Sequence, residues 1–454
     1  MPQQAYCLVL GGGGAKGVYH IGVWQALKEM AVPVDAFIGN SIGAVVAAFL
    51  AQGADEELLN IAGSINLSSL IQLNEGKALA DEGSLAQHSL SYWRDVYKNV
   101  VSRQGLDTRP MRSMLEQVID EDTLRASGCD FGITTVNISD FKPREVFLEQ
   151  MEPDQLINYV MASAAFPGFE RPEIAGKKYL DGGLYDNVPY TMARRRGYRK
   201  IILVDVSGIG LHRRPRTEGS QTVYIKNSID MGNAFDFDPT FIQRFLKLGY
   251  LDTLRAFGEL IGYQYFFEPN DRLEQECTAL LSADGLADRL QPLWPTLPTT
   301  MTHDRRQLLK LIEVCAELLD VDRIERYSYR ALHQAILHQV TTTRASVETF
   351  LAHHRLAETT TAHRLLDGFL QDLIQSRKFA DNPYYYHLLF GHFKPSKTLK
   401  VAATTLVKLY PTLALVDFYL ECLADRLAWQ LPPGETPSSS GKTLDAAGKA
   451  PEAD

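Results

Sequence analysis

The pentapeptide Gly39-Asn40-Ser41-Ile42-Gly43 places a serine in the spacing of a nucleophile elbow. An apolar run from Val34 to Ile38 precedes it, and the small apolar residues from Ala44 to Leu50 follow. This pattern predicts a strand, a tight turn that exposes the serine hydroxyl, and a helix, with glycines keeping bulk away from the turn. Small residues around a serine also occur in ordinary turns, so the motif by itself leaves both interpretations open.

A glycine-rich segment, Gly11-Gly12-Gly13-Gly14-Ala15-Lys16-Gly17, follows the apolar run from Tyr6 to Leu10. Helical spacing begins at Gly17 and continues to Met30. Consecutive glycines cost backbone entropy, and they suit a place where bare N–H groups must approach negative charge. The sequence therefore predicts an anion-binding loop that opens onto a helix N-terminus.

Three kinds of anion would suit this loop. A nucleoside triphosphate needs Gly-Lys-Ser/Thr, whereas Lys16 is followed by Gly17 and Val18. A dinucleotide needs Gly-x-Gly-x-x-Gly and a later acidic residue, which are present as Gly12, Gly14, Gly17 and Asp35. The oxyanion of an acyl-transfer reaction explains both motifs, because a parallel β-α-β unit would bring Ser41 beside the loop. We favour the oxyanion, since the dinucleotide leaves Ser41 unexplained.

The segment Asp181-Gly182-Gly183 is a candidate for the base that a serine nucleophile needs. Asp-Gly is also a common hairpin turn, so this motif is weak alone. A Ser-Asp-His triad would instead need a histidine after the serine. His212 and His303 satisfy that order, but neither lies in a turn with matching apolar flanks. His20 precedes Ser41 in the first predicted helix, where we expect a surface or core role.

Together these motifs resemble those of the patatin-like phospholipases, in the same order along the chain. The stretch from Ala162 to Gly168 is similar to that family's small-residue helix and turn, and the resemblance covers about residues 5–208. It implies a lipid acyl hydrolase with a Ser41–Asp181 dyad and no cofactor or metal. The implied oxyanion loop contains Gly12, Gly13 and Gly14, and the implied supporting motif residues are Lys16, Gly17, Gly39, Gly43, Gly182 and Gly183. Gly11 departs from the pattern, because many relatives carry a polar or acidic residue there.

A Ser-Asp dyad has a physical requirement of its own. The pKa of an exposed aspartate lies near 4, which is a poor match to a serine hydroxyl at neutral pH. Burial would raise that pKa, so we expect a sheltered cleft covered by mobile segments. The expected partner is a phospholipid or other acyl-ester substrate, met by peripheral contact with a membrane.

The composition bounds the class of protein. The chain has 454 residues, of which 45% are hydrophobic, and a formal net charge of −9 that gives no case for nucleic-acid binding. Its five cysteines show no paired or metal-binding spacing, which indicates reduced thiols in the cytoplasm. No apolar run is long enough to span a bilayer, and the first strand begins too early for a signal peptide.

Apolar runs alternate with helical patterns over the first half of the chain. The predicted strands are Tyr6–Leu10, Ala36–Ile38, Asp130–Val136 and Lys200–Val206. This alternation predicts an α/β fold, a mostly parallel sheet flanked by helices, in a patatin-like catalytic domain at residues 1–268. A helical cap is expected at about residues 54–107.

Long helical patterns, such as 305–319 and 323–340, predict an all-helical accessory domain at residues 269–431, and residues 432–454 have the composition of a disordered tail. This large region without motifs leaves open an alternative function. In that alternative the chain is a regulated effector whose hydrolase activity is switched on by a partner or small ligand through the helical domain.

Two basic clusters have different expectations. Arg194, Arg195 and Arg196 precede Gly197, which is the pattern of a helix C-terminus. Arg213, Arg214 and Arg216 lie in an expected loop, where no helix end needs them, and contact with anionic lipid remains open for this second cluster.

Overall fold

The computed structural model describes residues 5–64, 106–234, 238–272, 274–275, 279, 305–339 and 419. The chain divides into two compact units, of which the first contains residues 1–269 and 322–327, and the second contains residues 270–321 and 328–454. The predicted cap and accessory domain lie partly outside the described residues, and the predicted tail lies wholly outside them.

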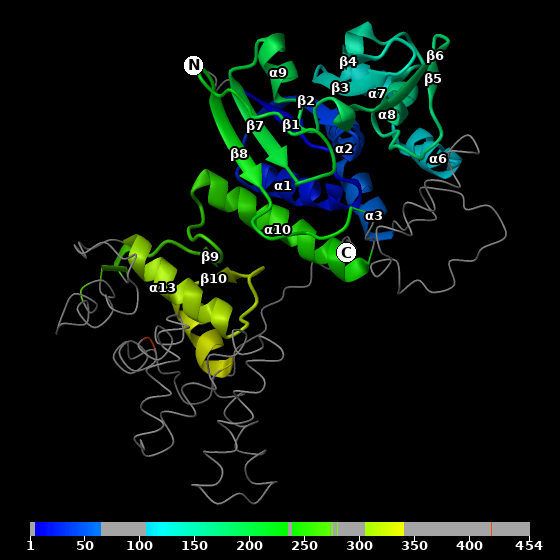
Figure 1. Cartoon of the computed structure of the whole chain (residues 1–454). Helices are drawn as coiled ribbons and strands as arrows, with labels where there is room; N and C mark the ends of the chain where they lie inside the picture. The colour runs from blue at the N-terminus through cyan, green and yellow to red at the C-terminus, as the bar shows by residue number, and fades with distance from the viewer. Residues whose placement is uncertain are drawn as a thin grey trace, which may run out of the picture. The chain divides into compact units, whose positions relative to one another are not determined.

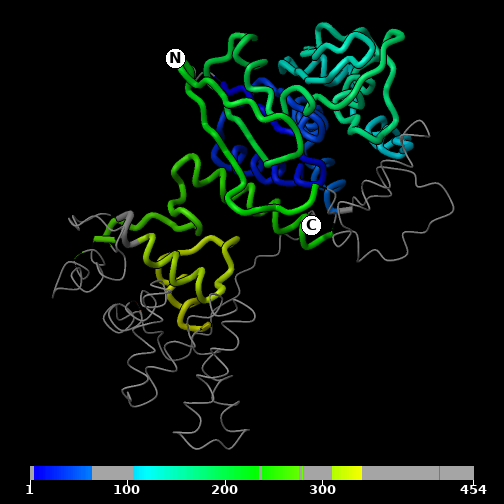
Figure 2. Tube along the Cα trace, viewed as in Figure 1, coloured from blue at the N-terminus to red at the C-terminus, as the bar shows by residue number. Residues whose placement is uncertain are grey.

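An eight-stranded sheet runs through the described part of the first unit (Figure 1). Its order is β5-β6-β3-β2-β1-β7-β8, and β4 pairs with the remaining edge of β3. The strands are β1 Tyr6–Leu10, β2 Val34–Asn40, β3 Asp130–Asn137, β4 Lys142–Phe147, β5 Glu173–Ile174, β6 Lys177–Asp181, β7 Lys200–Asp205 and β8 Gln221–Lys226. The pairs from β3 through β2, β1 and β7 to β8 are parallel, whereas β4, β5 and β6 join antiparallel. Figure 2 shows the first strand beside the distant segment 200–205.

Helices cover both faces of this sheet. They are α1 Val18–Glu29, α2 Ile42–Ala51, α3 Asp55–Ser64, α6 Arg109–Val118, α7 Glu121–Ala126, α8 Leu156–Ser163, α9 Tyr190–Arg196 and α10 Pro239–Phe257. Strand side chains alternate between the faces, as the pleat requires. Leu8 and Leu10 pack in the core that contains α1, α2 and α10, whereas Cys7 and Val9 pack with residues of α9.

Helices α1 and α10 approach each other closely at two glycines. A Cβ atom on Gly22 would lie 1.9 Å from the Leu246 carbonyl oxygen, and one on Gly249 would lie 2.1 Å from the Tyr19 carbonyl oxygen. The Tyr19 hydroxyl donates to Asp252 of α10 at 2.8 Å and ties the two helices together. Packing against α10 therefore fixes the position of α1, the helix that follows the glycine loop.

The register of β3 brings two distant segments together. One edge of β3 pairs with β2 up to Thr134, which lies opposite Asn40, and then with β6 from Thr135, which lies opposite Asp181. Because β2 is parallel and β6 antiparallel to β3, their carboxyl ends meet at adjacent residues. Asp181 therefore lies next to the residue that precedes Ser41.

The predicted fold class is confirmed, and the four predicted strands are present with small changes at their ends. The strands β4, β5, β6 and β8 were not predicted. β4 carries Lys142, Pro143 and Arg144 exposed, so its alternation is weak. The predicted C-terminus at Gly197 is confirmed, because Gly197 is left-handed (φ 108°) and caps α9.

In the described part of the C-terminal region, α13 Arg305–Leu318 agrees with the helical pattern at 305–319. The helix predicted over residues 323–340 is wrong at its first residues. β10 Arg326–Tyr327 pairs with β9 Phe266–Phe267 of the first unit, and a helix begins only at residue 329. Asp322 accepts from the Ile324 N–H in a turn that ends the preceding segment. None of the helices that the structure describes is both long and apolar enough to cross a membrane.

Candidate active site

Ser41 lies at the sharp turn between β2 and α2. Its backbone is left-handed (φ 55°, ψ −128°), a conformation that costs free energy in a residue with a side chain and that clusters at functional sites. The flanking glycines permit the turn. A Cβ atom on Gly39 would lie 2.2 Å from the Gly43 carbonyl oxygen, and one on Gly43 would lie 2.3 Å from the Leu10 carbonyl oxygen. The Ser41 N–H donates to the buried Ser163 hydroxyl at 3.0 Å.

The glycine loop connects β1 to a 3₁₀ turn at Gly14–Gly17 and to α1. Gly12 donates its N–H to the Asn187 carbonyl at 3.0 Å, and Gly13 and Gly14 line a cavity together with Ser41. Among the described residues, the N–H groups of Gly13 and Gly14 have no hydrogen-bond acceptor. Of the three glycines predicted for an oxyanion hole, only these two have N–H groups available for a ligand.

Close packing explains other glycines of the motifs. A Cβ atom on Gly12 would lie 3.0 Å from the Ser41 Cβ atom and closer still to two asparagine side chains. A Cβ atom on Gly17 would lie 2.3 Å from Ile42 of α2. These glycines allow the loop to touch the elbow without intervening side chains.

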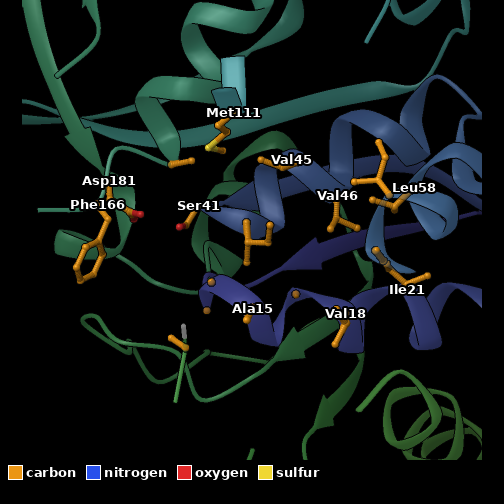
Figure 3. A pocket seen from close by; sticks show the side chains of 18 of the residues that line it. Ala15, Val18, Ile21, Ser41, Val45, Val46, Leu58, Met111, Phe166 and Asp181 are labelled. Atoms are coloured by element: carbon orange, nitrogen blue, oxygen red, sulfur yellow. The ribbon is translucent and has the colours of Figure 1, made fainter. Parts of the chain in front are cut away.

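Asp181 ends β6, and its side chain points toward Ser41 (Figure 3). The carboxyl is almost completely buried and accepts from the Gly183 N–H at 2.7 Å. Burial raises its pKa to about 6, although interactions with the Ser41 side chain, the Gly183 N–H and the Asn40 amide act in the opposite direction. The structure thus brings Asp181 and Ser41 together across the ends of two strands.

An asparagine network surrounds the two residues, and it was missed in the sequence. The Asn40 amide donates to Asp181 at 3.5 Å and to the Asn187 side chain at 3.3 Å, while Thr134 donates to the Asn40 oxygen at 2.9 Å. The Asn187 amide donates to the Gly12 carbonyl at 3.1 Å. The network connects the elbow, the aspartate loop and the glycine loop. Its only sequence signal is that Asn40 and Asn187 lie within or just after the two motifs.

The side chains of His20 and Lys16 form hydrogen bonds that fix the glycine loop. The His20 Nε2 atom lies 2.8 Å from the Gly11 carbonyl oxygen, so this nitrogen carries the proton. Complete burial lowers the pKa of His20 to about 4, and the ring is neutral near pH 7. The Lys16 ammonium donates to the Ser207 carbonyl at 3.3 Å. Of the surface and core roles that we expected for His20, the structure shows the core role and adds a contact to the glycine loop.

A cavity of about 140 Å³ contains Ser41 and Asp181 and extends along α2 (Figure 3). Its walls are apolar and come from the helices on this face, including Ile21, Val45, Phe49, Leu58, Ile61, Met111 and Met114. The only hydrogen-bonding side chains among its described lining residues are Ser41, Asp181 and Asn187. Its chemistry suits a hydrocarbon chain that ends at the Ser41 hydroxyl.

Over the part of the chain that it describes, the structure does not bring together the residues of the two alternative sites, the dinucleotide site and the Ser-Asp-His triad. Asp35 is exposed at the amino end of β2, opposite the sheet edge that carries the glycine loop, so it cannot contact a ribose beside that loop. His212 is exposed, bonds to the Gly208 carbonyl and does not line the cavity. His303 lies outside the described residues. Within the described part of the chain, no histidine lines the cavity with Ser41.

Comparison with known proteins finds relatives of the region that contains these residues. The family model for patatin-like phospholipases matches residues 8–194. Lysophospholipase NTE1 of Candida glabrata is 28% identical over 257 residues, which cover 56% of this chain and 14% of the relative. Lysophospholipase NTE1 of Cryptococcus neoformans is 31% identical over 207 residues, which cover 45% of this chain and 11% of the relative.

Among solved structures, VipD from Legionella pneumophila aligns with a TM-score of 0.37 and 14% identity, covering 91% of each chain. The family match rests on the sequence instead, and it includes the glycine loop, the elbow and Asp181. Residues 8–194 of this chain form a patatin-like phospholipase domain.

Proposed function

We propose that this chain is a lipid acyl hydrolase of the phospholipase A type, in which Ser41 and Asp181 form a catalytic dyad. The observation that carries the proposal is that Ser41 and Asp181 line the same apolar cavity, with the pKa of Asp181 raised to about 6 by burial. A base with this pKa is ionised near pH 7 and still accepts a proton more readily than an exposed aspartate. The lysophospholipase relatives support an ester of a single-chain phospholipid as substrate.

The proposed reaction has two steps. Asp181 accepts the Ser41 proton as the hydroxyl oxygen attacks the ester carbonyl, and the tetrahedral oxyanion receives hydrogen bonds from the Gly13 and Gly14 N–H groups. The C–O bond then breaks, and Asp181 returns the proton to the leaving alcohol. In the second step Asp181 takes a proton from the water that attacks the acyl-serine carbonyl. The C–O bond to Ser41 then breaks, Asp181 returns the proton to the Ser41 oxygen, and the fatty acid leaves. Every proton therefore passes through one carboxyl group.

The size of the cavity favours one acyl chain in the enclosed part of the site. A protein cavity of about 150 Å³ holds a molecule of about six carbons, and this cavity has about 140 Å³. Further carbons would extend toward the cavity mouth. A second chain of a diacyl lipid would have to stay outside, so we expect lysophospholipids to be hydrolysed faster than diacyl phospholipids.

Hydrolysis by the full chain and its variants tests the dyad. Ser41→Ala and Asp181→Asn should each lower kcat by about 10³-fold or more on a fluorogenic acyl ester, because each removes a reacting group. Asp186→Asn is the matched control. The Asp186 carboxyl is also buried with a pKa raised to about 6, but it does not line the cavity. Full activity in a folded Ser41→Ala or Asp181→Asn protein would refute the dyad.

A further inference from the structure

The connection from β7 to β8, residues 206–220, has neither helix nor strand and is longer than about 12 residues, a length that usually marks a functional loop. Glycines alternate with aliphatic residues at its start. A Cβ atom on Gly208 would lie 1.9 Å from the Gly12 carbonyl oxygen, and one on Gly210 would lie 2.7 Å from the Gly183 carbonyl oxygen. Ile209 and Leu211, between and after them, are 66% and 59% exposed. The glycines face the catalytic loops, and the two aliphatic side chains face water.

The backbone fixes this exposure. The Leu211 N–H donates to the Gly183 carbonyl at 2.9 Å, and the Leu211 carbonyl accepts from the Asn187 N–H at 2.8 Å. The loop is thus joined to the segment that follows Asp181, where Leu184 is also 46% exposed. Three large aliphatic side chains in water are unfavourable in the isolated protein, and the hydrogen bonds prevent them from turning inward.

Positive charge adjoins these side chains. Arg213 stacks on the Tyr185 ring and donates to the Tyr185 carbonyl. Arg214 and Arg216 are exposed, and neither has a carboxylate partner among the described residues. The formal net charge of the chain is −9, so this local excess of arginine is not a property of the whole surface.

The patch also lies at the mouth of the cavity, because Ile209 is one of the cavity's lining residues. We propose that Leu184, Ile209 and Leu211 with Arg214 and Arg216 form a docking surface for an anionic lipid surface. The aliphatic side chains enter the acyl region and the arginines bind lipid phosphates. An acyl chain then passes from the lipid into the cavity without crossing water, which a protein partner at this surface would prevent. This inference rests on the lipid-ester hydrolysis proposed above.

Binding of the full chain to vesicles tests the docking surface. The Ser41→Ala protein should float with phosphatidylcholine vesicles that contain phosphatidylglycerol, and bind less to phosphatidylcholine alone. Arg214→Ser/Arg216→Ser should weaken binding to the anionic vesicles by about 10- to 30-fold, since each surface arginine contributes about one decade or less. Leu211→Ser should weaken binding to both kinds of vesicle.

The matched controls lie outside the loop 206–220 and do not line the cavity. Arg199→Ser/Lys200→Ser also removes two positive charges, just before and at the first residue of β7. Tyr263→Ser removes an exposed large side chain that follows α10. Both controls should bind like the parent protein. Equal binding by the Arg214→Ser/Arg216→Ser and control proteins, or no binding of the parent protein to anionic vesicles, would overturn the inference.

The same proteins with Ser41 restored separate this inference from the proposed function. The Arg214→Ser/Arg216→Ser enzyme should hydrolyse a soluble short-chain ester at the parent rate and anionic vesicles more slowly. If no protein hydrolyses the soluble ester, the proposed function fails, while vesicle flotation still decides the docking surface.

Discussion

Replacing Asp181 with asparagine should stabilise the protein at neutral pH while abolishing hydrolysis. Asp181 is ionised near pH 7 inside an apolar cavity, and its pKa of about 6 compares with an ordinary value of 3.8. Between these two values the native state holds a proton that the unfolded state has released. The stability of the parent protein therefore falls as pH rises from about 4 to 6, and the loss remains constant above that interval.

The size of this loss follows from the shift. About two pKa units correspond to about 3 kcal/mol at 1.4 kcal/mol per unit. Asparagine has no charge to bury, and its carbonyl oxygen can still accept from the Gly183 N–H that now bonds to Asp181. Asp181→Asn should therefore gain about 3 kcal/mol relative to the parent protein between pH 4 and pH 8.

Thermal unfolding at both pH values measures the gain. For a unit of this size, about 3 kcal/mol raises the midpoint by roughly 6–12 °C at pH 8, and the difference from the parent should be small at pH 4. Asp186→Asn provides a calibration, because burial raises the pKa of Asp186 to about 6 as well, and its Oδ1 atom has no hydrogen-bond partner among the described residues. It should show the same pH-dependent gain with hydrolysis retained.

Two results would refute this reasoning. An Asp181→Asn midpoint raised equally at pH 4 and pH 8 would show that carboxylate ionisation is not the source of the gain. A lower midpoint at pH 8 would show that the charged form of Asp181 is stabilised by its neighbours, contrary to the direction of its pKa shift.

Three further predictions concern the reaction, the loop and the fold. The kcat/KM for an uncharged ester should rise with pH through about 6, as Asp181 loses its proton, and a flat profile from pH 5 to 8 would contradict its role as base. His20→Leu removes the hydrogen bond to Gly11 and should lower kcat about tenfold or more with KM unchanged, whereas His20→Gln keeps a donor there and should restore most of it; equal kcat in both variants would exclude a positioning role. Gly249→Ala should lower the free energy of unfolding by about 1–3 kcal/mol, which chemical denaturation measures, because its methyl group overlaps the Tyr19 carbonyl; an unchanged value would show that α1 and α10 separate freely.

The sequence predicted the elements around Ser41 well because each carries a local signal. An apolar run, a glycine loop and helical spacing determine β1 and α1, and the flanking glycines of the elbow have backbone contacts that leave no space for a side chain. The local sequence could not show that the Gly12 N–H bonds to protein whereas the Gly13 N–H is available to a ligand. Whether a glycine N–H faces the cavity or the Asn187 carbonyl depends on a segment about 175 positions away.

The position of Asp181 depends on β3 in the same way. Its approach to Asn40 requires that β2 and β6 share one edge of β3, and β6 was not predicted as a strand. Exposed residues such as Lys142 and Lys178 at β4 and β6 weaken the alternation that would reveal these antiparallel strands. Strands β4 and β6, and the asparagine network near the end of β6, depend on pairing between distant segments, which the local sequence does not reveal.

The close contacts between the three loops explain why an aspartate would act directly on Ser41 in the proposed reaction. Even one Cβ atom on Gly12 would meet Ser41, Asn40 and Asn187 within about 3 Å, so the elbow and the glycine loop have no space between them for an imidazole ring. In a triad the imidazole supplies a base with a pKa near 7. A carboxyl reaches a comparable value only when it is buried, and the apolar cavity that would hold the acyl chain also buries Asp181. Filling that cavity with substrate removes more water from the carboxyl, and binding should therefore raise the pKa of the base further at the moment when it must accept the serine proton.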